Sequence, residues 1–249
     1  MYFLSKSAPE ARSISVLCAL SLRLTESGSE TLFWRASAFR SRKVSGANEK
    51  LVVFVERGGK RYHMSFVRGE TVEKLTVKGD AKGTGTLVRF KPDTTIFTET
   101  RYDFSILENR LRELAFLNKG LTILLKDERA GQEREETYFY KGGLVQFVEW
   151  LNTNRKPLHP KPILIETMKD DVDIQLALQY DAGYQDTTLT FVNNINTHEG
   201  GTHLTGFKSA LTRTINDVAK RRDFLKKEDF TLSGEDIREG LTCVLHVKV

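Results

Sequence analysis

The proline-rich segment from Asn154 to Pro162 is the feature that most constrains how this chain can fold. Three of the five prolines of the chain lie in it: Pro157, Pro160 and Pro162. Proline fixes φ and has no backbone N–H, so neither a helix nor a central strand can continue through such a cluster. The sequence therefore predicts a domain boundary here, with one domain over residues 43–155 and another over residues 156–249.

The part before this boundary begins with the pattern of an antiparallel sheet. The expected strands are apolar, β-branched runs separated by turn residues: Leu51–Glu56, Tyr62–Val67, Glu73–Val77 and Thr84–Lys91. Gly58 and Gly59 favour a β-hairpin between the first two runs. A helical period follows over residues 103–118, with Asp103 as the expected N-cap. The remaining elements are a strand at 121–125, a charged turn at 126–136, a strand at 138–140 and a helix from 142 to 152.

The part after the boundary also mixes strands and helices. Strands are expected at 163–167, 174–180, 187–192 and 241–249, and a short helix at 235–238. A long helix is expected from Thr202 to Arg221, with Thr202 as its N-cap. Its apolar stripe is formed by Leu204, Phe207, Leu211, Ile215 and Val218. The whole chain is therefore predicted to be an α+β protein built from two layered units.

Composition adds limits on location and partners. The net charge of +5 permits a polyanionic partner such as DNA without requiring one. Cys18 and Cys243 lie far apart, which argues against a disulfide scaffold or a zinc site and agrees with a reducing cytoplasm. Arg23 interrupts the longest apolar run, Ile14–Leu24, so no membrane span is expected. Residues 1–42 have no stable period, and we expect an aberrant or poorly ordered segment there.

The chemistry-bearing motifs are few. Neither a P-loop nor a dinucleotide-binding glycine motif occurs, and no histidine pair has the spacing of a helical zinc site, so no catalytic or metal residue is predicted. Gly83–Thr86 can bring backbone N–H groups to a ligand or can simply form a tight turn into a strand. The junction Gly200–His203 can bind an anion at a helix N-terminus or can simply cap that helix. The residues alone leave both pairs of interpretations open.

Several blocks of sequence are nevertheless specific when taken together. They occur in this order: Leu111–Asn118, Gly142–Asn152, Asn193–Ile195, Glu199–His203, Gly206–Phe207, Thr212–Thr214 with Asn216, and Ser233–Leu241. Over about 200 residues this series resembles the DNA gyrase B and topoisomerase IV B family, the ATPase subunits of bacterial type IIA DNA topoisomerases. Which of the two enzymes it resembles more stays open, although gyrase is favoured.

The resemblance implies a fold and a role. The fold would be the C-terminal part of a Bergerat (GHKL) ATPase sandwich over residues 43–155. A partial transducer with a ribosomal S5 domain 2-like fold would follow over residues 156–249. In the family, ATP and Mg²⁺ binding dimerises two such heads around a DNA duplex. A separate protein of the gyrase A type cleaves the DNA.

The resemblance also assigns residues. Gly85 and Thr86 match the floor of the adenine pocket, and Arg57 matches the arginine at its mouth. The transducer signature is Gly200, Gly201, Thr202 and His203. Arg213 is assigned to the basic cavity that holds DNA in the family, and its alternative is an ordinary surface charge.

The chain departs from the family where the phosphates should bind. Lys43–Gly46 resembles the start of the lid motif, but Ala47–Leu51 follows at once and resembles the far end of the next helix. The glycine-rich phosphate loop, the catalytic glutamate, the magnesium-binding asparagine and the adenine-binding aspartate find no match. The transducer lysine that reaches the γ-phosphate finds none either. Without a positioned base or a metal clamp, we expect no ATP turnover.

Three hypotheses follow from these observations. The first is a truncated or rearranged fragment of a gyrase B-type protein, an enzyme by family but not by its own residues. The second is a non-catalytic binding module that pairs with intact heads or with DNA. The third is a frameshift or gene-model error, which the break at Lys43–Leu51 favours.

Overall fold

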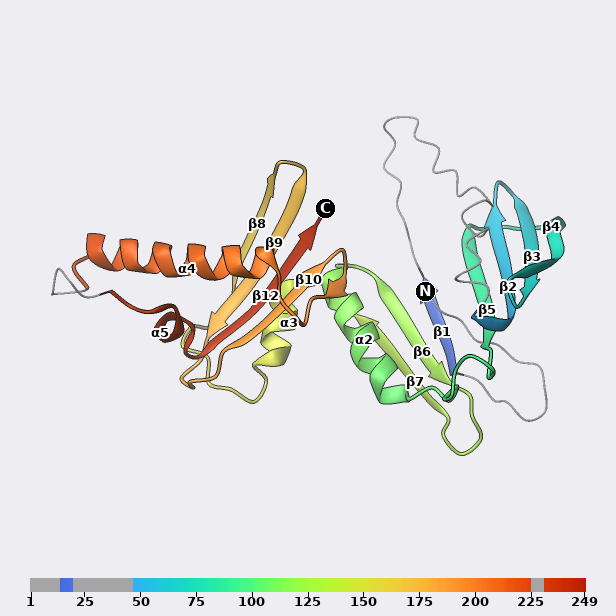
Figure 1. Cartoon of the computed structure of the whole chain (residues 1–249), viewed down its shortest axis with the longest axis horizontal. Helices are drawn as coiled ribbons and strands as arrows, with labels where there is room; N and C mark the ends of the chain where they lie inside the picture. The colour runs from blue at the N-terminus through green and yellow to red at the C-terminus, as the bar shows by residue number, and fades with distance from the viewer. Residues whose placement is uncertain (1–13, 20–46, 225–230) are drawn as a thin grey trace. The chain divides into compact units, whose positions relative to one another are not determined.

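A computed structural model describes residues 14–19, 47–224 and 231–249 of the chain (Figure 1). It divides into two compact units, Met1–Arg112 with Leu121–Phe139, and Glu113–Gly120 with Tyr140–Val249. The predicted boundary between residues 155 and 156 falls inside the second unit, because the helix before it packs on the sheet after it. As a division into family domains, that boundary stays a prediction.

The first unit contains a four-stranded antiparallel sheet in the order β4-β3-β2-β5. Its strands are β2 (Asn48–Arg57), β3 (Lys60–Val67), β4 (Glu70–Asp80) and β5 (Gly85–Pro92). The predicted hairpin is confirmed, since β2 and β3 are joined by Gly58 at φ 58° and Gly59 at φ 74°. A two-residue turn with two positive φ angles matches the twist of the strands, and glycine adopts it at little cost.

One face of this sheet carries a small core. Leu51, Val53 and Phe66 are buried, and four partly buried side chains pack around them: Val55, Met64, Val88 and Phe90. The edge strand β4 is exposed along its whole length. The apolar core on this sheet is therefore limited to the strands β2, β3 and β5.

A second sheet in the same unit has the order β1-β6-β7. Its strands are β1 (Ile14–Ala19), β6 (Thr122–Asp127) and β7 (Arg134–Phe139). Two sequence expectations were wrong here. Residues 1–42 were expected to be aberrant or poorly ordered, yet residues 14–19 form β1, and the rest of that segment lies outside the described residues. Residues 126–136 were expected to form a turn throughout. Charged residues occur in β7 because most of its side chains are exposed, which leaves Tyr138 as its buried residue.

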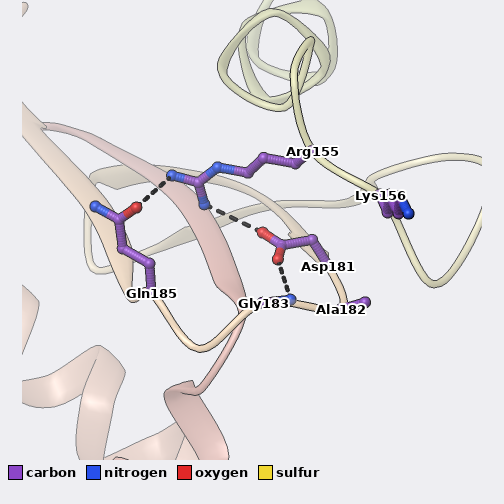
Figure 2. Close-up of a pocket in the computed structure, with 6 residues that line it drawn as sticks. All are labelled: Arg155, Lys156, Asp181, Ala182, Gly183 and Gln185. Atoms are coloured by element: carbon purple, nitrogen blue, oxygen red, sulfur yellow. Dashed lines mark hydrogen bonds and ion pairs between the residues drawn. The ribbon is translucent and has the colours of Figure 1, made fainter.

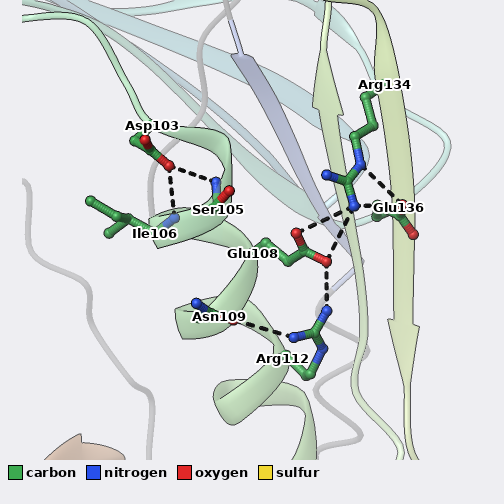
Figure 3. Close-up of polar contacts among 8 residues, drawn as sticks. All are labelled: Asp103, Ser105, Ile106, Glu108, Asn109, Arg112, Arg134 and Glu136. Carbon is green, nitrogen blue, oxygen red and sulfur yellow. Dashed lines mark hydrogen bonds and ion pairs between the residues drawn. The ribbon is translucent and has the colours of Figure 1, made fainter.

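Helix α2 (Phe104–Leu117) begins where the sequence predicts (Figure 3). The carboxylate of Asp103 accepts hydrogen bonds from the backbone N–H groups of Ser105 and Ile106, at 2.8 and 3.1 Å. Glu108 then accepts from Arg112 at 2.5 Å and lies 3.3 Å from Arg134 of β7. The cap satisfies N–H groups that a helix start leaves unpaired, and the ion pairs tie the helix to the sheet.

The second unit contains a five-stranded mixed sheet in the order β11-β10-β12-β9-β8. Its strands are β8 (Ile163–Lys169), β9 (Val172–Tyr180), β10 (Thr187–Val192), β11 (Ile195–Asn196) and β12 (Leu241–Lys248). Its helices are α3 (Leu144–Leu151), α4 (Thr202–Arg221) and α5 (Gly234–Arg238). Strands β10 and β12 pair in parallel, and the other described pairs of this sheet are antiparallel. The mixture of helices and sheets confirms the predicted α+β class.

Alternation along β12 gives this sheet a core on each face. Leu241, Cys243, Leu245 and Val247 point to one face, where Phe207 and Leu211 of α4 pack. Val244 points to the other face, onto the cluster formed by α3 and the last turn of α2. That cluster contains Phe116, Leu117, Leu144, Phe147, Val148, Ala177 and Phe191. The central strand is therefore buried on both sides.

The long helix follows the prediction in length but not in detail. Its bounds are those expected, whereas its N-cap is Gly201, and Thr202 is the first helical residue. Val218 was expected on the apolar stripe but is 45% exposed, and Ala219 is buried in its place. In the part of the chain that the structure describes, no helix is long and apolar enough to cross a membrane.

Candidate functional site

The residues assigned to the adenine pocket lie together on the four-stranded sheet. Thr86 pairs directly with Val55, and Gly85 pairs with Glu56, so Arg57 is the next residue along β2. Directly paired residues share a face of a sheet and neighbours alternate, so Thr86 and Arg57 lie on the same face as Val55. That face is the one that carries the core of Leu51 and Val53.

These residues lie in the open. Arg57, Gly85 and Thr86 are exposed. An added Cβ on Gly83 or on Gly85 would meet nothing within 4 Å. The geometry of Gly83–Thr86 therefore agrees with a turn into β5, and the pairing brings the three assigned residues to the same end of the four-stranded sheet, with Thr86 and Arg57 on one face. Their role in binding adenine stays a prediction.

The four residues assigned to the transducer signature, Gly200 to His203, form the start of α4 and the two residues before it. Gly200 has φ 82° and Gly201 has φ 151°, values that side chains disfavour. A Cβ on Gly201 would lie 2.8 Å from Cε1 of His203. The Nε2 atom of His203 lies 2.9 Å from Oγ1 of Thr197, which in turn lies 2.6 Å from Oγ1 of Thr190. Gly201 is therefore needed because the His203 ring folds back over it toward Thr197, which in turn contacts Thr190 of β10.

Further along α4, Asn216 has a role that its place in the motif did not reveal. Its side-chain amide donates to the carbonyl of Leu232 at 3.0 Å and accepts from the N–H of Leu232 at 2.8 Å. This double hydrogen bond imitates a strand pair and fixes the segment that leads into α5. Arg213 lies on the exposed side of the same helix, so its assignment to a DNA cavity stays a prediction.

An open cavity of about 330 Å³ lies beside the end of β9 in the second unit (Figure 2). It is lined by Arg155, Lys156, Asp181, Ala182, Gly183 and Gln185. The guanidinium of Arg155 donates to Asp181 at 3.1 Å and to Gln185 at 3.4 Å. Sequence analysis missed this group, because Arg155 lies in the proline-rich segment, whose composition indicates only a boundary.

Two buried titratable side chains lie on β12. Burial lowers the pKa of His246 to about 4, and Lys248 contributes in the same direction. Neither ring nitrogen of His246 has a hydrogen-bond partner among the described residues. Burial also raises the pKa of the Cys243 thiol far above its usual range. Both groups are therefore neutral core residues at pH 7, and Cys243 is no nucleophile.

Comparison with known proteins gives this arrangement its context. Residues 143–249 match the family model described as DNA gyrase B. The chain is 48% identical over 206 residues to the gyrase B protein of Staphylococcus epidermidis, covering 82% of this chain and 32% of that relative. It is 44% identical over 206 residues to the gyrase B protein of Bacillus mycoides, covering 82% of this chain and 51% of that relative.

Solved structures agree with these relatives. The 43K ATPase domain of Thermus thermophilus gyrase B, in complex with an aminocoumarin, has a TM-score of 0.72 and 39% identity to this chain. That similarity covers 83% of this chain and 56% of the other. The B-subunit of the DNA gyrase from Myxococcus xanthus has a TM-score of 0.70 at 23% identity, which supports the fold alone. The chain spans about a third of the length of the Staphylococcus epidermidis relative.

Proposed function

We propose that this chain, which is similar to DNA gyrase B, is a transducer-bearing fragment of the ATPase subunit of a bacterial type II DNA topoisomerase. Such an enzyme supercoils or relaxes DNA at the expense of ATP. In this proposal the chain contributes the transducer and does not turn over ATP by itself. The family model covers residues 143–249, which contain all five strands of the five-stranded sheet and the whole signature around α4.

The state of the phosphate lid is the observation that carries the proposal. The start of the lid motif, Lys43–Gly46, is followed directly by Ala47–Leu51, and Asn48 already begins β2. No room remains there for a glycine-rich loop and its helix. The exposed Thr86 and Arg57 would contact a base at most, because a loop of backbone N–H groups is what holds triphosphate oxygens in place.

ATP and Mg²⁺ are accordingly the cofactors of the proposed parent enzyme. For this chain alone we expect neither tight binding nor hydrolysis. The proposed partners are DNA, a second head of the same type and a cleavage protein of the gyrase A type. The proposed location is the cytoplasm, where the family acts on the chromosome.

A steady-state ATPase assay on the purified chain tests the catalytic part of this proposal. We expect no magnesium-dependent turnover above background, while an intact gyrase B head assayed alongside turns over ATP. A Thr86→Ala variant serves as the matched control. Turnover by the chain that this variant abolishes would contradict the proposal and would show that Thr86 lies in a working site.

A second candidate function is that of a non-catalytic module that pairs with intact heads or with DNA. The net charge of +5 and the exposed Arg213 favour it. Pull-down with an intact gyrase B head and DNA binding at increasing salt would test it. Two results would support the binding module. The affinity for DNA should fall as salt is increased, and Arg213→Glu should weaken DNA binding more than Lys169→Glu does. Binding to neither partner would leave only the inert fragment.

A further inference from the structure

The connection between α3 and β8, residues 152–162, is paired to the end of β9 through its backbone. The N–H of Leu158 donates to the carbonyl of Tyr180 at 2.8 Å, and the N–H of Ala182 donates to the carbonyl of Lys156 at 3.0 Å. Pro157 and Asp181 form an antiparallel bridge between these two bonds. The connection therefore occupies the edge of β9 beyond Leu178, where the pairing with β8 stops.

Side chains near Arg155 hold the first half of this connection to the sheet. Arg155 donates to Thr242 at 3.0 Å and to Thr187 at 2.8 Å, and it pairs with Asp181. The buried Asn152 accepts from Thr242 at 2.6 Å and donates to the buried Gln179 at 2.9 Å. Arginine stays charged throughout the ordinary pH range, so this half of the attachment does not depend on the protonation of its guanidinium.

His159 holds the second half, and both of its ring nitrogens are engaged. Nδ1 lies 2.7 Å from the carbonyl oxygen of Lys161, and Nε2 lies 3.1 Å from the backbone nitrogen of Tyr180. The backbone carbonyl of His159 also accepts from Gln179 at 2.8 Å. A carbonyl can only accept and a backbone N–H can only donate, so Nδ1 must carry the proton and Nε2 must be bare.

The geometry therefore requires the neutral imidazole with its proton on Nδ1. A protonated ring has two N–H groups and no acceptor, so the N–H of Tyr180 would lose its partner and face another N–H. Histidine is the side chain whose charge ordinarily changes between about pH 5 and 8. From this we propose that His159 is a proton-sensitive latch that fastens the α3–β8 connection to the edge of β9 and releases it on protonation.

The charged groups on the two elements that hold the His159 ring determine whether a positive charge on that ring could be compensated. On the connection itself these are Lys156 and Lys161, both exposed. From β9 and the residue after it they are the carboxylates of Asp173, which is paired with Lys248, and of Asp181. The Tyr180 hydroxyl is neutral and donates to the carbonyl of Ile237. Asp181 is already engaged by Arg155 and by the N–H of Gly183. Within these two elements no carboxylate is therefore left over to compensate a charged ring, and release of the latch is the expected response.

Hydrogen exchange measured by NMR on the full chain tests the latch. Protection factors of the Tyr180 and Leu158 amides are compared between about pH 8 and about pH 5.5. We expect protection of both amides to fall about ten-fold on acidification, while protection of Val244 in the central strand changes less than about two-fold. An unchanged Tyr180 amide would overturn the proposal, and a parallel loss at Val244 would show global loosening instead.

Two variants separate His159 from other titrating groups. In His159→Gln a side-chain oxygen can still accept from Tyr180 without titrating, so protection should be independent of pH. In His159→Leu it should be low at both pH values. If His159→Gln loses protection as the unmodified chain does, another group such as His246 is responsible and the proposal fails.

A direct reading of the tautomer covers the case in which a variant does not fold. The ¹⁵N shifts of the His159 ring report which nitrogen carries the proton at high pH. A proton on Nδ1 supports the latch, and a proton on Nε2 overturns it. The proposal concerns only the second unit, so its test does not depend on whether the chain turns over ATP.

Discussion

The four-stranded sheet of the first unit and the five-stranded sheet of the second differ in how much of each is covered. On the four-stranded sheet, three buried residues form the core and β4 is exposed along its whole length. On the five-stranded sheet, helices pack on both faces and each face has its own buried cluster. Burial of apolar surface is the main stabilising contribution, so the five-stranded sheet is the part expected to fold robustly.

The largest effect should come from the cluster under α3. Phe147 is 1% exposed, and its ring stacks on Phe116 with centroids 4.7 Å apart. Phe147→Ala should lower the free energy of unfolding by about 3–5 kcal/mol, because it removes a buried ring and leaves a cavity. Urea denaturation measures this loss. Phe139→Ala, at a half-exposed ring, is the matched control and should change stability by less than about 1 kcal/mol. Equal effects of the two variants would remove the basis of the comparison.

The next effect concerns pH and the buried His246. Its pKa in the folded state is lowered to about 4, so the folded protein favours the neutral ring while the unfolded chain binds the proton more readily. The contribution of neutral His246 to the free energy of unfolding is complete above the ordinary histidine pKa near 6.5, and it is lost as the pH falls toward 4. The loss should reach about 3 kcal/mol.

Denaturation midpoints across this pH range test the expectation, with His246→Leu as the comparison. The variant should show a flatter pH dependence, and it should not be less stable than the unmodified chain at pH 7, because it removes two buried nitrogens that have no partner among the described residues. A slope that persists unchanged in His246→Leu would assign the pH dependence to other groups.

A smaller effect should follow from the polar attachment at the start of β12. Thr242→Val removes a hydroxyl that donates to Asn152 and accepts from Arg155, leaving two polar groups with one partner fewer. We expect a loss of about 2 kcal/mol in the free energy of unfolding. Thr167→Val on the exposed strand β8 makes the same change of shape and should stay within about 0.5 kcal/mol. Similar losses in both variants would mean that the attachment contributes nothing.

The smallest effect should be on β4. Leu75 is 54% exposed, so Leu75→Thr should alter stability by less than about 0.5 kcal/mol. Thermal denaturation of the two proteins provides the measurement. A loss above about 2 kcal/mol would show that β4 is covered in solution, and the contrast between the two sheets would then be smaller than described.

Much of the fold follows from local sequence signals. The glycine hairpin, the Asp103 cap and the long helix after the signature all lie where the sequence predicts them, because short-range turn and capping chemistry determines them. The strand β11 was missed because two residues give no period. The strand β7 was mistaken for a turn because its charged residues face solvent. The exposure of Val218 depends on which helical face meets the sheet, which periodicity defines only to within one residue.

The geometry of the candidate site could be predicted from the sequence only in small part. Family resemblance identified Gly201 and His203 as a signature, but not that the ring folds over the glycine. Arg155 and His159 were hidden in a segment whose prolines suggested only a boundary. Their partners lie about 20 to 90 residues away, at Gln179, Tyr180 and Thr242. Side-chain attachments of that range are set by tertiary packing, for which a single sequence carries no periodic signal.

The order of the five-stranded sheet has a consequence for how it is made. Its central strand, β12, inserts between β9 and β10, yet it follows both of them in the chain, after α4 and α5. During synthesis the two flanking strands emerge first and have no common neighbour until residues 241–248 leave the ribosome. Closing contacts between distant parts of a chain is slow, because the loop entropy is lost before the contacts form. Until then the unpaired edges of β9 and β10 can pair with the wrong strands. Assembly of this sheet is therefore the folding step at which a chaperone would be most useful, because it would prevent such mispairing.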